Sequence, residues 1–148
     1  MKKLRKLVLI AVPFLSALHL TQSYANEGVA FIHGTGKQTD AYNDYWNPNF
    51  VNTVKSGLPD SSRYTVINCD FDQFMWKEQA AGCLASQLNN FIDNKQITRL
   101  TLLTHSNGGN VVRWILSNPT YDSRFPNIVN KTTKVIAVAP SSGGTPLA

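Results

Sequence analysis

Histidine and cysteine are scarce in this sequence, and their scarcity argues against a metal site. The 148 residues include two cysteines, Cys69 and Cys83, and three histidines, His19, His33 and His105. The cysteines lack the C-x-x-C spacing of redox and zinc sites, and the histidines form no matching ligand cluster. The sequence therefore predicts no metal and no other cofactor.

No apolar run here is as long as the roughly 20 residues that a membrane-spanning helix needs. The uncharged, mostly apolar stretch at residues 7–20 follows a basic cluster, and Ser23-Tyr24-Ala25 then offers small residues for a cleavage site. This order predicts a secretory signal peptide over residues 1–25 and a secreted or periplasmic protein. An uncleaved membrane anchor is the alternative.

The remaining chain has too little net charge for a nucleic-acid-binding protein. Four of the 14 basic residues lie in the expected signal peptide, whereas all nine acids lie after it. The basic character of the whole chain therefore belongs to the targeting segment, and no positive footprint for nucleic acid is left. Residues 26–148 contain no repeat or low-complexity tract, which predicts a single domain.

The two cysteines are predicted to form a disulfide. Cys69 and Cys83 belong to a chain that should reach an oxidising compartment. Closing a loop of this length stabilises a protein by about 3 kcal/mol in the chain-entropy model. Two separate buried thiols are the alternative, since the sequence does not give the distance between them.

Strand and helix patterns alternate along the chain. Short apolar runs predict strands at residues 29–32, 64–68, 100–104 and 134–138. Apolar residues at helical spacing occur around Phe50, Val51 and Val54, at residues 77–93, and from Gly109 to Asn118. The alternation predicts an α/β fold with a mostly parallel sheet, helices on both faces, and ligands at the carboxyl ends of the strands.

Ser106 stands at one such end and is the candidate nucleophile. A sharp strand-to-helix turn holds a serine hydroxyl clear of its own backbone, and it needs small residues two positions before and after the serine. Gly108 meets this need, whereas Thr104 departs from the G-x-S-x-G pattern. An ordinary loop or helix cap is the alternative for such a serine.

The segment His33-Gly34-Thr35-Gly36 follows the first predicted strand and is the candidate oxyanion loop. Acyl transfer builds negative charge on a carbonyl oxygen, which backbone N–H groups placed in advance stabilise. The N–H groups of Thr35 and Asn107 are the predicted donors. A tight turn is the alternative, and a phosphate loop is disfavoured because the lysine and the spaced glycines of a P-loop are absent.

Three segments resemble α/β-hydrolases, and within them secreted lipases and esterases: residues 31–36, 103–109 and 138–148, the last similar to A-P-x-x-G-T-x-L-A. The resemblance implies a serine hydrolase of carboxylic esters that forms an acyl-enzyme on Ser106. It implies that the supporting residues of the elbow and the oxyanion loop are His33, Gly34, Gly36, Thr104, His105, Gly108 and Gly109.

The resemblance also implies a histidine base and an acid after the nucleophile, in the order Ser, Asp or Glu, His. After His105 the chain has no histidine and one acid, Asp122, which precedes the predicted strand at 134–138 and is therefore not assigned. We expect a partial domain, truncated after that strand, with the triad acid and histidine outside this chain. A non-catalytic α/β-hydrolase-like binding protein or an inactive fragment is the alternative.

Side chains in the loops give one indication of the substrate. The candidates for an acyl-chain pocket are Tyr42, Tyr45, Trp46, Phe71, Phe74, Met75 and Trp76. Packing of the first helix on the sheet is an equal alternative for Trp46 and Phe50. In the family, a single-glycine H-G-x loop favours longer acyl chains, so we expect a lipid ester such as an acylglycerol and transient contact with a lipid interface.

Processing of the exported protein tests the signal-peptide prediction. We expect amino-terminal sequencing of exported material to begin at Asn26, because cleavage is predicted after Ala25. A sequence that begins at Met1 would instead support the membrane anchor.

Overall fold

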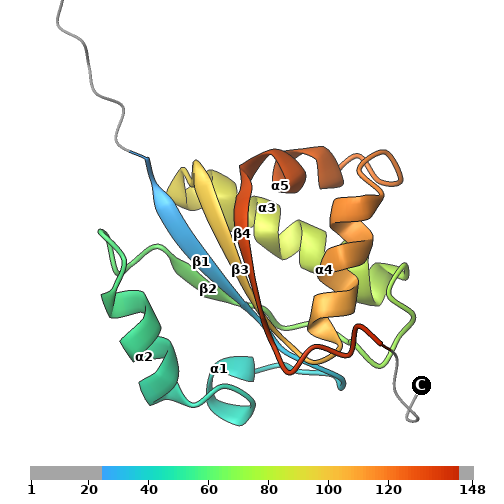
Figure 1. Cartoon of the computed structure of the whole chain (residues 1–148), viewed down its shortest axis with the longest axis horizontal. Coiled ribbons are helices and arrows are strands. Elements are labelled where there is room, and N and C mark those ends of the chain that lie inside the picture. Colours follow the sequence, from blue (N-terminus) through green and yellow to red (C-terminus); the bar gives the residue numbers. More distant parts are fainter. Residues whose placement is uncertain (1–24, 144–148) are drawn as a thin grey trace, which may run out of the picture.

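Four parallel strands form the centre of the computed structural model, which describes residues 25–143 (Figure 1). In chain order the strands are β1 (Glu27–Ile32), β2 (Tyr64–Val66), β3 (Arg99–His105) and β4 (Thr132–Val138). Their order in the sheet is β2-β1-β3-β4, which confirms the predicted parallel α/β sheet. The predicted signal peptide, apart from Ala25, and residues 144–148 of the third family-like segment lie outside the described residues.

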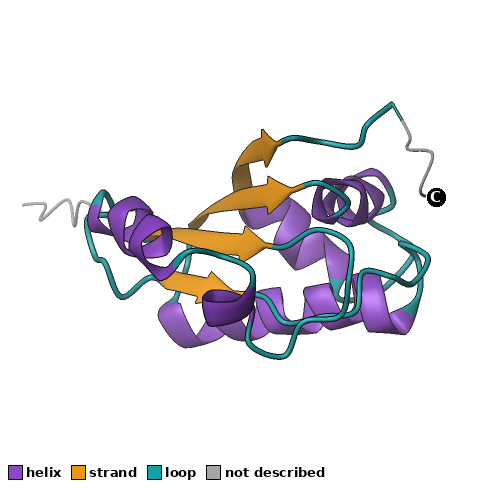
Figure 2. Ribbon diagram, turned by 90° about the horizontal axis from the view of Figure 1, so that it is seen from below, coloured by secondary structure: helices purple, strands orange, loops and turns teal. Residues whose placement is uncertain are grey.

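Helices cover both faces of this sheet, as Figure 2 shows. On one face lie α1 (Ala41–Asp44) and α2 (Pro48–Ser56). On the other lie the π-helical turn η1 (Glu78–Gly82) and the helices α3 (Cys83–Lys95), α4 (Gly108–Ser117) and α5 (Phe125–Lys131). The prediction of helices on both faces is confirmed.

The alternation of β1 side chains divides the core in two. Val29 and Phe31 pack with Trp46 and Val51 of the α1–α2 side, whereas Ala30 and Ile32 belong to the larger cluster with η1, α3, α4 and α5. Each large aliphatic or aromatic side chain that is fully buried contributes about 1.5–3 kcal/mol. Packing on both faces therefore fixes the register of β1 in the sheet, and with it the point at which the following loop begins.

Three details of the elements were not predicted. The predicted helix at 77–93 begins with the π-helical turn η1. Helices α1 and α5 lie where the sequence pattern predicted loops. Each has a helix-start signal: Asp40 accepts a capping hydrogen bond from Asn43 N–H before α1, and Pro126 stands in the first turn of α5.

The prediction that the second strand continues to Asn68 is wrong. Ile67 N–H still donates to Phe31 O at 3.0 Å. The Asn68 backbone instead pairs with the Gln87 side-chain amide, whose Oε1 accepts from Asn68 N–H at 3.1 Å and whose Nε2 donates to Asn68 O at 2.7 Å. This α3 side chain takes the place of the next ladder hydrogen bonds, so β2 ends at Val66.

Strand β4 is an exposed edge of the sheet. Within the described part of the chain it pairs only with β3, and Val135, Ile136 and Val138 are each 42% exposed.

The predicted disulfide is confirmed. Cys69, in the loop after β2, is bonded to Cys83, the first residue of α3, with an S–S distance of 2.07 Å. It joins the carboxyl end of the sheet to the helical layer.

None of the helices described between residues 25 and 143 has the length and apolar character needed to cross a membrane.

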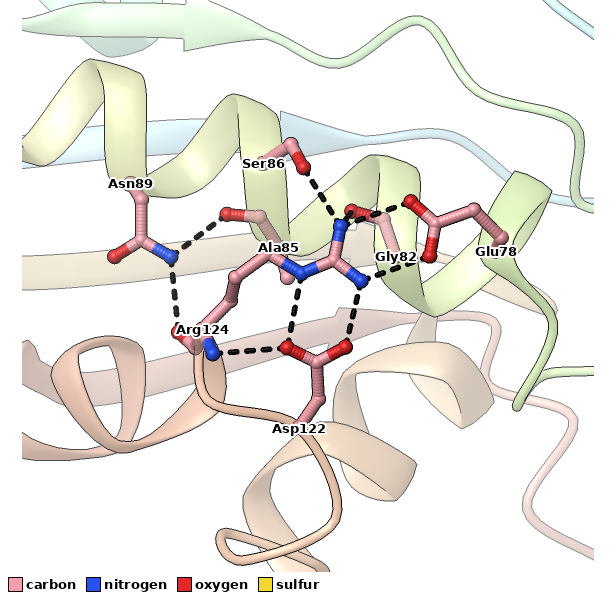
Figure 3. Close-up of polar contacts among 7 residues, drawn as sticks. All are labelled: Glu78, Gly82, Ala85, Ser86, Asn89, Asp122 and Arg124. Carbon is pink, nitrogen blue, oxygen red and sulfur yellow. Dashed lines mark hydrogen bonds and ion pairs between the residues drawn. The ribbon is translucent and has the colours of Figure 1, made fainter.

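Arg124 ties the start of α5 to η1 (Figure 3). Its guanidinium donates to Glu78 Oε2 at 2.8 Å, to Asp122 Oδ2 at 2.6 Å, and to Gly82 O and Ser86 Oγ. Hydrogen bonds from Arg124 lower the pKa of Asp122 to about 2. The carboxylate of Asp122 is thus occupied by a structural ion pair, which agrees with leaving it unassigned as the triad acid.

Acid titration should expose the contribution of this ion pair. The pKa of Asp122 in the folded protein lies below its ordinary value of 3.8, so its stabilising effect is present above about pH 4 and is lost as the pH falls toward 2. We expect urea unfolding to show a loss of about 1 kcal/mol over this range that Asp122→Asn lacks. Asp44→Asn, at a carboxylate without an ion pair among the described residues, should keep the full dependence. Identical acid profiles for Asp122→Asn and the unmodified protein would contradict this assignment.

Candidate active site

Ser106 occupies a sharp turn between β3, which ends at His105, and α4, which begins at Gly108. Its φ is 49°, in the left-handed region, which costs a residue other than glycine about 1–3 kcal/mol. Its N–H donates to Val138 O at 3.1 Å, and its carbonyl accepts from Gly109 N–H at 3.1 Å. The turn is therefore held from both sides, with the strand–turn–helix geometry that a nucleophile elbow needs.

Two glycines allow the loop after β1 to lie against this turn. A Cβ at Gly108 would collide with the His33 carbonyl oxygen and lie 3.0 Å from Ile32 O. A Cβ at Gly34 would lie 2.9 Å from the Ser106 Cβ. The candidate oxyanion loop and the candidate nucleophile, 72 residues apart in sequence, are thus in direct contact.

Thr104 fits two positions before the serine because the residue facing it is small. Thr104 is buried, and its Oγ1 donates a long hydrogen bond of 3.5 Å to Ile136 O. A Cβ at Gly109 would lie 3.3 Å from Thr104 Oγ1. Gly109 therefore leaves the room that a threonine needs at this position.

The two candidate oxyanion donors belong to the two segments that meet at Ser106. Asn107 directly follows it, and Thr35 follows Gly34, which lies against the serine side chain. Neither the Thr35 nor the Asn107 N–H donates a hydrogen bond within residues 25–143. Gly36, with a φ of 113°, turns the loop away immediately afterwards. Two backbone donors without an acceptor among the described residues are thus each one residue along the chain from a residue at this contact.

His33 is buried beneath this loop. Its Nδ1 lies 2.8 Å from Gly34 O, its Nε2 accepts from Cys69 N–H at 3.3 Å, and its ring stacks on Phe71 at 4.4 Å. Burial lowers the pKa of His33, so the ring is neutral at pH 7, and its partners assign the proton to Nδ1. With both nitrogens engaged, His33 links the loop after β1 to Cys69 in the loop after β2.

His105 points away from the hydroxyl that it precedes. Its Nδ1 is hydrogen-bonded to the Tyr45 hydroxyl, and the two rings meet edge to face at 5.6 Å. Burial raises the pKa of Tyr45, so its hydroxyl stays protonated at neutral pH. Neither His33 nor His105 hydrogen-bonds to Ser106 Oγ, so the described residues supply no imidazole base for it.

The loop aromatics separate into packing residues and exposed residues. Trp46 is only 7% exposed and packs with Phe31 and Val51, which is the packing alternative for this residue. Phe74 and Trp76 are 65% and 43% exposed, and their rings stack at 4.9 Å.

A shallow pocket of about 380 Å³ lies beside α4, and it includes one of the predicted acyl-pocket residues, Met75. Its other lining residues include Asn110, Arg113, Trp114 and Ser141, and Ser106 does not line it. Of the seven loop residues predicted to line an acyl-chain pocket, this pocket is lined by Met75 alone.

Sequence reasoning missed a network of amides beside the elbow. Asn107 Nδ2 donates to Phe71 O at 3.0 Å, and Asn110 Nδ2 donates to Asn107 Oδ1 at 3.0 Å and to Ser141 Oγ at 2.9 Å. The spacing of Asn107 and Asn110, three residues apart at a helix start, is a signal for the pair. The contact with Phe71 has no sequence signal.

The described residues hold no group of three or more side chains placed to bind a metal.

No protein-family model and no curated protein sequence matches this chain. A solved structure of an iodinated complex of acetyl xylan esterase is similar to it, with 21% sequence identity and a TM-score of 0.46. The match covers 76% of this chain and 63% of that esterase chain. This chain thus spans less than two thirds of the length of that esterase.

A pair of glycine substitutions tests the close contact at the elbow. Gly108→Ala should lower the free energy of unfolding by about 3 kcal/mol or more, because its Cβ meets a backbone oxygen that cannot move independently. Gly109→Ala, one residue on in the same helix, should change it by less than about 1 kcal/mol, because it meets only a side-chain oxygen at 3.3 Å. Equal effects in urea unfolding would mean that the elbow and the loop are not in contact.

Proposed function

We propose that this protein is a hydrolase of carboxylic esters that forms an acyl-enzyme on Ser106. One observation supports the proposal: Ser106 has a positive φ at a turn that contacts Gly34, and the next N–H on each of the two segments, of Thr35 and Asn107, has no acceptor among the described residues. This is the arrangement that acyl transfer requires, because the donors are in place before negative charge develops.

The reaction follows from these groups. Ser106 Oγ attacks the ester carbonyl carbon and loses its proton, while the carbonyl oxygen becomes an oxyanion that accepts from Thr35 and Asn107 N–H. Collapse of this intermediate breaks the bond to the alkoxy oxygen, and the alcohol leaves with a proton. Water then attacks the acyl-serine by the same route and releases the carboxylic acid.

The proton on Ser106 is the limiting feature. At neutral pH a serine hydroxyl is almost fully protonated, and the described residues place no imidazole against it. Serine hydrolases without their triad keep roughly a thousandfold advantage over water from the oxyanion hole and from binding. We therefore propose that the 148-residue chain, as it stands, acylates slowly and turns over poorly.

Lipid esters are the proposed substrates, and secretion the proposed destination. The exposed Phe74 and Trp76 rings offer an apolar surface for an acyl chain or a lipid interface. The Cys69–Cys83 disulfide fits an oxidising compartment. A non-catalytic binding protein on the same sheet is the second candidate, favoured by the absence of an imidazole at Ser106 Oγ within the described residues.

Acylation of Ser106 tests the enzymatic proposal. After incubation with p-nitrophenyl butyrate, we expect peptide mapping by mass spectrometry to find one butyryl group per chain, on Ser106. Ser106→Ala should remove the adduct, whereas Ser56→Ala, at a hydroxyl on the distant helix α2, should leave it unchanged. A chain that carries no butyryl group on Ser106, or the same adduct in Ser106→Ala, would favour the binding protein.

The pH dependence of the same reaction reports on the base. Without imidazole, acylation needs the serine alkoxide or hydroxide, so its rate should rise about tenfold per pH unit from pH 6 to 9. A rate that levels off near pH 7 would show that a histidine serves Ser106 after all.

A further inference from the structure

A short loop segment after β2, residues 69–71, contacts the candidate oxyanion loop along its length. Gln38 N–H donates to Cys69 O at 2.9 Å, and Phe71 N–H donates to Gly36 O at 3.0 Å. These two hydrogen bonds frame an antiparallel bridge between Lys37 and Asp70. The loop that carries Thr35 is thus paired with residues 69–71 immediately after the donor itself.

The same segment also holds the elbow. Phe71 O accepts from Asn107 Nδ2 at 3.0 Å, and Asn107 Oδ1 in turn accepts from Asn110 Nδ2. Phe71 therefore links both donor-bearing segments through its own peptide groups, with its N–H bonded to the loop of Thr35 and its carbonyl to the side chain of Asn107.

Residues 69–71 are themselves anchored to the helical layer. The disulfide bonds Cys69 to Cys83 at the start of α3, and Asp70 N–H donates to Gln79 O of η1 at 3.2 Å. Cys69 N–H donates to His33 Nε2, whose ring lies under the loop. The η1 turn is in turn clamped by Arg124 (Figure 3). A covalent bond thus fixes a segment that is hydrogen-bonded both to the loop of Thr35 and to the Asn107 side chain.

We propose that residues 69–71 are the positioning element of the oxyanion hole, that the Asn107 side chain is its contact with the elbow, and that acylation of Ser106 depends on the Cys69–Cys83 disulfide. The inference rests on the proposed function and adds that the redox state of the disulfide regulates it. Thr35 is exposed, so its N–H keeps its direction only while the adjacent backbone is held. An oxyanion hole works because its donors need no reorganisation, so loss of this support lowers the rate of the chemical step more than binding of the ester.

Two perturbations test the proposal in the folded protein. Asn107→Ala removes the contact with Phe71, and dithiothreitol converts the disulfide to two thiols while it is itself oxidised to a cyclic disulfide. For each we expect the acylation rate at saturating p-nitrophenyl butyrate to fall tenfold or more, with the half-saturating concentration unchanged. Asn127→Ala is the matched control, because it deletes a comparable part-buried amide hydrogen bond, to Asn89 on the far side of α3, and should leave the rate unchanged.

Amide hydrogen exchange separates positioning from general destabilisation, and it does not depend on the proposed function. Reduction or Asn107→Ala should speed exchange at residues 34–38 while β3 and the interior of α4 stay protected. Unchanged exchange at residues 34–38 would overturn the positioning role even if Ser106 is never acylated. Acylation of Ser106 at the rate of the oxidised chain in both perturbed proteins would overturn it while leaving the proposed function intact.

Discussion

The close approach of the first residue of α4 to the loop after β1 is the constraint on which the site depends. Gly108 lies so near the His33 carbonyl oxygen that no side chain fits between them, and Gly34 lies against Ser106. Ser106 must then turn through a positive φ to connect β3 to α4 in so little space. The strain, about 1–3 kcal/mol, is offset by the two cores that fix β1 and β3, because neither strand can shift to relieve it.

The parts of this fold that could be predicted from sequence are those with local causes. Strands β1, β3 and β4 and helix α4 follow from apolar patterns, and the elbow follows from a serine placed between two of them. The end of β2 could not be predicted, because Gln87, 19 residues away, takes over the Asn68 backbone groups. The contact of Asn107 with Phe71 spans 36 residues and involves a backbone carbonyl, which no residue type reveals.

The two histidines show how hydrogen-bond partners decide the role of an imidazole. Both belong to motifs in which a base could be sought, yet His33 is held neutral between Gly34 O and Cys69 N–H, and His105 is paired with Tyr45. Desolvation lowers the pKa of His33 more than its hydrogen bonds raise it. The candidate site is therefore built mainly from backbone dipoles and turn geometry, which need no titration to act.

The strained serine and the unpaired donors bear on the choice between an enzyme and a binding protein. A binding protein that used only the sheet and its loops would gain nothing from a positive φ at Ser106. Relief of that strain would raise the free energy of unfolding by about 1–3 kcal/mol. Strained backbone persists where the surroundings over-determine it, and here the turn is held by the close contacts at Gly34 and Gly108 and by the hydrogen bonds of Ser106 with Val138 O and Gly109 N–H. Such support is what the proposed acyl transfer requires, because its backbone donors must be in place before charge develops.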